Sequence, residues 1–546
     1  MQGGKFITDE FGLSFEINSD TNEIRGVNCV EVNYKAIEKI SDIIESSLGP
    51  NGRDKIIVDQ DERITVTNDG RTILENFISA ENVTSPALVL AKELSESQDN
   101  EIGDGTTSLV LIAKELLKNS LDLMKVKIHP VRIAEGNVKA LNYVLEYMKT
   151  ELCESIEKEK LRYACLEAAK TSLNSKVAGY FEGLPEICVN ALFNICGERD
   201  GSIDLEKINI KLIKGGLMNQ TELVNGVVIE KEMVISKKMM EQFTVNKECK
   251  IALLACPFEP PKLKNTGNII ISNCEEYMNL SSYERDTFLE MIRLVKESGA
   301  DLVLCQWGFD DEATSMLLEN DLPAVRWVPG HELGYLGSLL NGKIVSRFED
   351  LSSDSLGVCN VRLSEVGTDN TKFIYFTNKE VNNTTSTIIV RCANKFVGAE
   401  IERSITDALC AARNVMVESK IIYGGGSTEL SIYCAINNFK RDKNHILNLL
   451  EPVDCSCFKM FAESLLVIPE VLAKNSGHPT DYVEKIIDAI VTNNLKNVGI
   501  DCFEGNEYAE MDKMRVFESF KSKASQYKMA VDFVNSILKI NEAIRK

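Results

Sequence analysis

A glycine-rich turn that leads directly into an apolar helix is the feature that most constrains this chain. The turn is Gly103–Ser108, and the residues Leu109–Leu117 that follow have the spacing of an amphipathic helix. Two glycines allow a tight turn and a close approach of the backbone to a ligand. The free N–H groups and the positive dipole end of the helix then meet at one point, which favours a phosphate group.

Asp104 lies within this turn, where a carboxylate and a phosphate would repel one another. A divalent cation between them removes the conflict, because Mg²⁺ binds one or two carboxylates together with phosphate oxygens. The hydroxyls of Thr106, Thr107 and Ser108 add donors for the same oxygens. Aspartate and threonine are also common helix N-caps, so the motif taken alone is equally consistent with a structural cap.

Length and charge exclude several classes of protein. A chain of 546 residues predicts several domains. Its net charge of −21 argues against nucleic acid as the main partner. No apolar run approaches the roughly 20 residues that cross a bilayer, and the first residues do not resemble a signal peptide, so we expect a cytoplasmic protein. The sixteen cysteines are scattered along the chain, which favours small buried apolar residues over zinc ligands.

Both ends of the chain have a mainly helical pattern, and the middle has the pattern of a small α/β layer. In the N-terminal part we expect a helix over 37–48, a strand pair at 56–58 and 64–67, a short helix after Gly70, a long helix after Ser108 and a further helix from Pro130 to about Thr150. In the middle we expect strands at 251–254, 302–305 and 324–328, separated by helices around 288–295 and 311–318. After residue 400 we expect a helix, a strand at 420–423 and a second glycine-rich turn at Gly424–Gly426.

Five motifs occur in an order that resembles the group II chaperonins. They are Leu48–Lys55, Val66–Gly70, Gly103–Ser108, Arg403–Leu409 and Tyr423–Gly426. Further segments resemble one subunit type of the eukaryotic cytosolic chaperonin, namely Asp9–Gly12, Ile128–Ala134, Cys256–Lys262, Cys305–Ala313 and Leu322–Trp327. The resemblance extends over essentially the whole chain.

The resemblance implies a multi-domain α+β and α/β fold with nested connectivity. A helical equatorial domain would combine residues 1–148 with 410–546, and a small intermediate domain would combine 149–215 with 369–409. The α/β apical domain would be residues 216–368. Its insertion from Phe258 to about Ser282 would form a lid protrusion, whereas the alternative is a disordered surface loop.

The same resemblance implies roles for particular residues. Asp104 would hold Mg²⁺, and Asp407 would orient or deprotonate the attacking water with help from Asp69. Residues that would contact the nucleotide are Gly49, Gly105, Thr106, Thr107, Ser108, Gly425, Asp501, Glu518 and Lys523. Lys176 would belong to a nucleotide-sensing loop. Alternatives remain open here: Lys176 as a surface lysine, Asp69 as a turn residue, and Asp407 as a solvated carboxylate, because it lies off the apolar face of its helix.

These roles imply a chaperone subunit that uses ATP, converts it to ADP and requires Mg²⁺. Its partners would be seven other paralogous subunits in a hetero-oligomeric double ring, and its substrates unfolded proteins that include actin and tubulin. A nucleotide-binding structural subunit with little hydrolysis is the alternative, although the presence of Asp69, Asp104 and Asp407 together argues against it. A metabolic nucleotide enzyme fits less well, since the chain has neither a P-loop nor a dinucleotide-binding motif.

Three departures from the family pattern carry expectations of their own. Arg71 stands where family members have a small residue, and we expect it to alter the charge around Asp69. Cys392 and Ala393 replace glycines, which we expect to change the geometry of the intermediate hinge. The sequence stops soon after Glu542, so we expect no long tail in the ring cavity.

Overall fold

The contacts between residues divide the chain into two compact units. The computed structural model describes residues 5–8, 14–17, 22–25, 27–58, 62, 64–80, 86–196, 203–243, 246–259, 270–367, 371–378, 385–437, 450–493 and 495–545. One unit joins Met1–Val189 to Arg403–Lys546, and the other is Asn190–Glu402. We call them the helical unit and the sheet unit.

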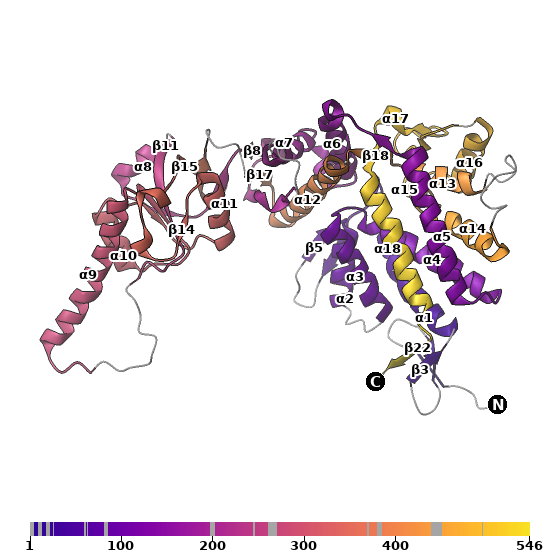
Figure 1. Cartoon of the computed structure of the whole chain (residues 1–546), viewed down its shortest axis with the longest axis horizontal. Helices are drawn as coiled ribbons and strands as arrows, with labels where there is room; N and C mark the ends of the chain where they lie inside the picture. Colours follow the sequence, from indigo (N-terminus) through magenta and orange to yellow (C-terminus); the bar gives the residue numbers. More distant parts are fainter. Residues whose placement is uncertain are drawn as a thin grey trace. The chain divides into compact units, whose positions relative to one another are not determined.

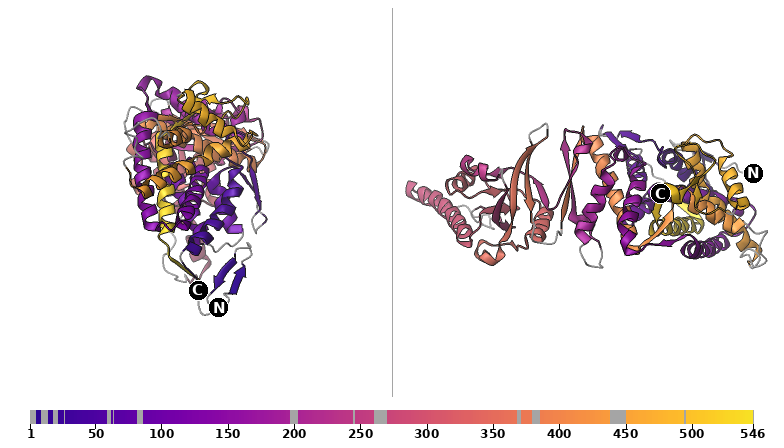
Figure 2. Two further views of the ribbon diagram at one scale, coloured as in Figure 1. Left: turned by 90° about the vertical axis from the view of Figure 1, so that its right-hand side faces the viewer. Right: turned by 90° about the horizontal axis from the view of Figure 1, so that it is seen from above.

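The helical unit is a bundle in which the long helices α4, α5 and α18 lie side by side (Figure 1). Its helices are α1 (Val27–Glu45), α2 (Gly70–Ala80), α3 (Pro86–Glu101), α4 (Thr106–Lys125), α5 (Pro130–Tyr147), α6 (Lys158–Leu173), α13 (Ser427–Asn437), α14 (Pro452–Leu465), α15 (Val467–Asn475), α16 (Tyr482–Asn493), α17 (Met511–Met514) and α18 (Phe520–Leu538). The chain passes between the units within α7 (Leu184–Cys196) and α12 (Lys395–Glu418). Figure 2 shows the bundle from two further sides.

The apolar face predicted for the first helix is confirmed. Ile37, Ile40 and Ile44 are fully buried in the core of the helical unit. The helix begins ten residues earlier than expected, at Val27, and ends before Leu48. Cys29, Val30 and Ala36 are buried as well, so the apolar face of this helix extends further toward its N-terminus than predicted.

Short sheets surround this bundle. The predicted strand pair is confirmed as β4 (Lys55–Val58) and β5 (Ile64–Thr67), which are antiparallel. The strand predicted at 420–423 is β18 (Lys420–Tyr423), and it lies between β6 (Glu154–Ser155) and β21 (Phe517–Ser519). The remaining pairs are β1 (Lys5–Thr8) with β2 (Ser14–Ile17), β3 (Asn22–Arg25) with β22 (Glu542–Arg545), and β19 (Val498–Gly499) with β20 (Ala509–Glu510).

The sheet unit is built on a mixed eight-stranded sheet of order β10-β13-β12-β11-β15-β16-β9, with β14 also paired to β11. These strands are β9 (Val227–Glu230), β10 (Met233–Val234), β11 (Lys247–Leu254), β12 (Leu302–Cys305), β13 (Ala324–Val325), β14 (Ile344–Val345), β15 (Gly357–Val366) and β16 (Thr371–Thr377). A second sheet contains β7 (Ile208–Lys214), β17 (Ser386–Cys392) and β8 (Glu222–Val224). The helices are α8 (Lys237–Phe243), α9 (Cys274–Ser298), α10 (Asp311–Glu319) and α11 (Gly330–Leu340).

Both faces of the large sheet are buried, which explains the continuous apolar run that predicted β11. Ile251 and Leu253 point into one core, while Ala252 and Leu254 point into another, because successive side chains of a strand alternate between faces. Strands β11, β12 and β13 are parallel to one another, as the predicted alternation of strand and helix requires.

The third strand of this layer is shorter than predicted. It was expected over 324–328, but β13 ends at Val325. Trp327 has φ = 59°, in the left-handed region, and a backbone with that dihedral cannot continue an extended strand.

The predicted insertion from Phe258 to Ser282 is helical in its last part, because α9 already begins at Cys274. The large phenylalanine that opens the segment, Phe258, is buried against Phe288 and Phe309. Residues 260–269 lie outside the described residues, and so do Asp9–Gly12, which contributed to the resemblance.

The division into three domains at residues 148, 215, 368 and 409 stays a prediction, as does the effect of Cys392 and Ala393 on a hinge. The Cys392 thiol is buried at the end of β17, with its Sγ 3.6 Å from the carbonyl oxygen of Ile213. Within the described ranges, no helix combines the length and the apolar character that a membrane span requires.

Candidate functional site

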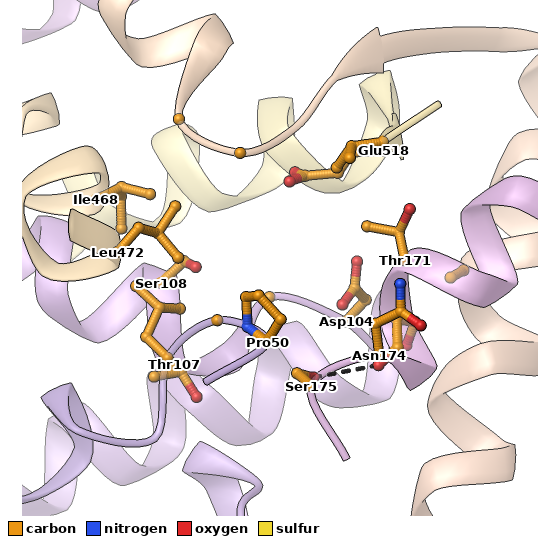
Figure 3. A pocket seen from close by; sticks show the side chains of 18 of the residues that line it. Pro50, Asp104, Thr107, Ser108, Thr171, Asn174, Ser175, Ile468, Leu472 and Glu518 are labelled. Atoms are coloured by element: carbon orange, nitrogen blue, oxygen red, sulfur yellow. Dashed lines mark hydrogen bonds between the residues drawn. The ribbon is translucent and has the colours of Figure 1, made fainter. Parts of the chain in front are cut away.

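A cavity of about 250 Å³ in the helical unit collects most of the residues singled out by the sequence. Gly49, Gly105, Thr106, Thr107, Ser108 and Gly425 line it, together with Asp69, Asp104, Lys176, Asp407, Glu518 and Lys523. Figure 3 shows Thr107 and Ser108 on one side of the cavity and Asp104 on the other, with Glu518 above them in this view. Segments from both ends of the chain therefore form one site.

The turn before α4 has the predicted geometry. Gly103 and Gly105 have φ values of 73° and 78°, which glycine adopts without strain. Gly105 is the N-cap of α4, and no side chain caps the helix. Asp104 and Thr106 are therefore not acting as caps, and the first N–H groups of α4 are left for another acceptor.

Asp104 lies half-buried at the cavity, where its Oδ2 accepts a hydrogen bond from the Ser522 hydroxyl at 3.2 Å. Its main-chain oxygen accepts one from the Gln98 amide at 2.8 Å. Burial raises the pKa of the Asp104 carboxyl, while Lys176 and the Ser522 hydrogen bond oppose that rise. Ser522 of α18 thus holds the Asp104 carboxylate, and Gln98 of α3 holds the main chain of the same residue.

Asp69 lies both in a turn and at the cavity. Its Oδ2 accepts from the backbone N–H and the hydroxyl of Thr72, at 3.0 and 2.8 Å, and so caps α2. Its Oδ1 accepts from the Thr106 hydroxyl at 3.0 Å. The guanidinium of Arg71 binds Asp99 and lies 3.7 Å from Glu96, and both carboxylates belong to α3. Arg71 therefore offsets negative charge on α3 and makes no ion pair with Asp69.

Lys176 and Asp407 form an ion pair between the loop after α6 and α12. Their side chains are only 11% and 20% exposed, so Lys176 is not a surface lysine and Asp407 is not a solvated carboxylate. Burial raises the pKa of Asp407 to about 7 against the opposing effect of Lys176, and the charge of Asp69 adds to the rise. Burial also lowers the pKa of Lys176, but Asp407 and the neighbouring carboxylates outweigh it and the net pKa is raised.

Two hydrogen bonds hold this ion pair beside Asp69. The Asn68 amide donates to the carbonyl oxygen of Ser175 at 2.7 Å, which ties the Lys176 loop to the turn before α2. The Arg403 guanidinium donates to the carbonyl oxygen of Val66 at 2.9 Å, which ties α12 to β5. Asp69, Lys176 and Asp407 therefore come together although they are far apart in the sequence.

The second glycine turn forms another part of the wall. Gly425 has φ = 65°, and a Cβ there would lie 2.7 Å from Sδ of Met511. Nearby, Nζ of Lys523 lies 3.1 Å from Oε2 of Glu518, and the Lys523 side chain is 3% exposed. Burial raises the pKa of the Glu518 carboxyl, while Lys523 opposes the rise.

Asp501 is the predicted site residue that does not line the cavity, although Ile500, Cys502 and Phe503 do. The Asp501 carboxylate accepts four hydrogen bonds, from the backbone N–H groups of Phe503, Glu504 and Asn506 and from the Asn506 amide. These bonds lower its pKa although burial opposes them. Its contact with the nucleotide stays a prediction.

The sequence did not single out several residues of the wall that Figure 3 labels: Pro50, Thr171, Asn174, Ser175, Ile468 and Leu472. The polar run from Thr171 to Lys176 was a usable signal, because a nucleotide-sensing loop was expected there. Ile468 and Leu472 on α15 gave no signal, since their spacing is that of ordinary core residues.

The charge of this cavity restricts what it can bind. Asp69, Asp104 and Asp407 lie near the ammonium group of Lys176, whose charge acts on all three, and the charge of Lys523 acts on Asp104 as well. A polyphosphate alone would be repelled by the remaining negative charge, whereas a phosphate that arrives with a divalent cation would not.

Comparison with known proteins identifies the family. A family model described as the TCP-1/cpn60 chaperonin family matches residues 40–546. "T-complex protein 1 subunit epsilon" of Encephalitozoon cuniculi is 41% identical, with 98% of each chain covered. That is the subunit type which the middle segments resemble. "Thermosome subunit" proteins of Pyrococcus horikoshii and Pyrococcus abyssi are 32% and 31% identical, with 96% of this chain and 92% of theirs covered.

The order of the five motifs, the cavity they form and these matches along nearly the whole chain agree. This chain belongs to the TCP-1/cpn60 chaperonin family.

Proposed function

We propose that this chain is the ATP-hydrolysing subunit of a ring-shaped group II chaperonin that encloses and folds non-native proteins. One observation carries the proposal: a single cavity combines the uncapped N-terminus of α4 with the three carboxylates of Asp69, Asp104 and Asp407. Helix N–H groups favour phosphate, and carboxylates favour a cation or a water molecule.

Asp104 is the residue that would hold Mg²⁺. Its carboxylate lies at the uncapped helix start, and only its Oδ2 is engaged by a side chain of the described residues, Ser522. Mg²⁺ bound there would neutralise part of the phosphate charge. The hydroxyls and N–H groups of Thr106–Ser108 would then donate to phosphate oxygens.

Asp407 is the residue that would accept the proton of the attacking water. Water attacks the γ-phosphorus, its proton passes to the Asp407 carboxylate, and the bond to the β-phosphate oxygen breaks to release ADP and phosphate. A base with a pKa of about 7 is matched to this task near neutral pH. Lys176 would turn from Asp407 to the γ-phosphate, which frees the carboxylate for water.

One experiment distinguishes this proposal from the alternative, which is a structural subunit that binds nucleotide with little hydrolysis. The assembled particle is incubated with radiolabelled 8-azido-ATP, irradiated, and resolved into its subunits. Diphosphate bound to this chain supports hydrolysis at this site. Triphosphate alone would favour the structural subunit, and no labelling would contradict nucleotide binding.

We further propose a hetero-oligomeric double ring in the cytoplasm, with seven other paralogous subunits and with actin and tubulin among the substrates. The names of the relatives, a T-complex subunit and thermosome subunits, support assembly of this kind. Large subunit interfaces are apolar, so the chain expressed alone should aggregate or form irregular rings. Native mass spectrometry of particles purified through a tag on this chain tests the proposal, and a stable monomer would contradict it.

The three-domain division proposed above gives each part a role in this cycle. The equatorial domain (1–148 and 410–546) would contain the nucleotide site, and the intermediate domain (149–215 and 369–409) would carry Lys176 and Asp407 to it. The apical domain (216–368) would contact substrates and carry the lid protrusion.

A further inference from the structure

A buried chain of charged groups lies behind the Glu518 wall of the cavity. Nζ of Lys523 donates to Oε1 of Glu429 at 2.6 Å and to Oε2 of Glu518 at 3.1 Å. The hydroxyl of Tyr527 donates to the same Oε1 of Glu429 at 3.0 Å. Glu518 and Lys523 line the cavity, whereas Glu429 and Tyr527 do not.

Glu429 depends on these two donors to an unusual degree. The Glu429 and Tyr527 side chains are fully buried, at 0% exposure. Lys523 and Tyr527 both donate to Oε1 of Glu429, and among the described residues its Oε2 has no hydrogen-bond partner. A buried charge with so few partners is sensitive to the loss of any one of them. Burial keeps Tyr527 a donor, because it raises the pKa of the phenol well above its usual value.

Glu518 is held from two sides. A Cβ added to Gly424 would lie 2.4 Å from Oε1 of Glu518, so the backbone of the second glycine turn packs against the carboxylate. Lys523 holds the other oxygen. The place of Lys523 is fixed in turn by Glu429, which lies 94 residues earlier on α13.

We propose that Glu429 and Tyr527 are positioning residues for the nucleotide site: they fix Lys523, and Lys523 turns the Glu518 carboxylate to face the ligand. This inference rests on the proposed function, since it takes nucleotide as the ligand. Neither residue lines the cavity. Tyr527 acts on Glu429, Glu429 acts on Lys523, and Lys523 acts on Glu518.

The test uses Tyr527→Phe, because Glu429→Gln would leave Lys523 buried with less opposing charge and could unfold the chain. The assembled particle is photolabelled with 8-azido-ADP and Mg²⁺, and the half-saturation concentration is measured on this chain. We expect Tyr527→Phe to raise the half-saturation concentration about three- to tenfold. The variant loses a hydrogen bond to a charged group, Glu429, and this loss reaches the nucleotide only through Lys523 and Glu518. The matched control is Tyr34→Phe, which removes a tyrosine–glutamate hydrogen bond within α1, from Tyr34 to Glu38.

The second arm asks whether Tyr527 acts through Glu518. In a double-mutant cycle with Glu518→Gln, the effect of Tyr527→Phe should shrink to about twofold or less, because the carboxylate that it positions is gone. Unchanged half-saturation in Tyr527→Phe, or equal effects in the two backgrounds, would overturn the inference. Failure of the unmutated chain to become labelled would instead contradict the proposed function.

Discussion

Asp407 differs from a residue on an exposed helix face in its burial and in its ion-pair partner. It is largely buried, and its partner Lys176 comes from a loop 231 residues earlier. Burial favours the protonated acid, and the pair with Lys176 limits that effect, so the pKa settles at about 7. A carboxylate of this kind can take up and release a proton near neutral pH.

Asp407→Asn should slow hydrolysis by this chain about 10²- to 10⁴-fold, because a positioned base contributes that much to the rate. Photolabelling by 8-azido-ATP should persist, with the nucleotide retained as triphosphate. Asp104→Asn is the contrasting variant, and it should weaken labelling itself, since Asp104 would hold the cation. Undiminished conversion to diphosphate in Asp407→Asn would contradict the assignment.

The raised pKa of Asp407 predicts a pH dependence of definite sign. The base acts as a carboxylate, so kcat/KM for this chain should rise with pH across about pH 6 to 8. At pH 6 roughly a tenth of the groups would be ionised if the pKa is about 7. Single-turnover conversion of limiting 8-azido-ATP measures this profile, and a flat profile over that range would count against Asp407 as the base.

At the scale of elements, the starts of α2 and α4 are packed together at Gly70. A Cβ on Gly70 would lie 2.7 Å from the Thr107 hydroxyl and 3.0 Å from its backbone nitrogen. Since Asp69 caps α2 and accepts from Thr106 on α4, this close approach also sets the distance between the carboxylate and the phosphate-binding turn.

Gly70→Ala should therefore separate the two helix starts, lower the melting temperature by about 2–4 °C and raise the half-saturation concentration for nucleotide. The control is Gly334→Ala in α11, where an added Cβ meets nothing within 4 Å. That variant should be neutral or slightly stabilising, because alanine reduces the freedom of the unfolded chain. Thermal denaturation gives the melting temperature of each variant, and photolabelling gives its half-saturation concentration for nucleotide. Equal changes in the two variants would contradict the packing argument.

At the scale of the whole molecule, the proposed chaperonin cycle requires an element of the sheet unit that responds to nucleotide. The first turns of α9 are well exposed, with Tyr277 and Met278 at 66% and 69%. These exposed side chains lie within the segment to which the lid role is assigned, so the first turns of α9 are the part of that segment where a protease test can be made.

Protease should therefore cut around residues 270–282 in the open particle and much less when a transition-state mimic of ATP hydrolysis closes it. Mass spectrometry of the fragments locates the cuts, and cleavage in the helical unit serves as the internal reference. A disordered surface loop would be cut equally in both states, and that result would rule out the lid.

The sequence by itself determined the features that depend on neighbours along the chain. The glycine turn and α4, the pair β4–β5 and the buried run of β11 follow from local dihedral preferences and from apolar periodicity, and all were predicted. Family resemblance added Asp407, Lys176, Glu518 and Lys523 as site residues.

Only the tertiary structure decided what those side chains face. Periodicity indicated that Asp407 lies on the polar side of its helix, but the partner on that side, Lys176, comes from a distant segment. No sequence pattern predicted the pairing of Glu429 with Lys523 or the four hydrogen bonds that Asp501 accepts. Charge and hydrogen bonding act through space over a few ångströms, so these environments exist only once the bundle has brought both ends of the chain together.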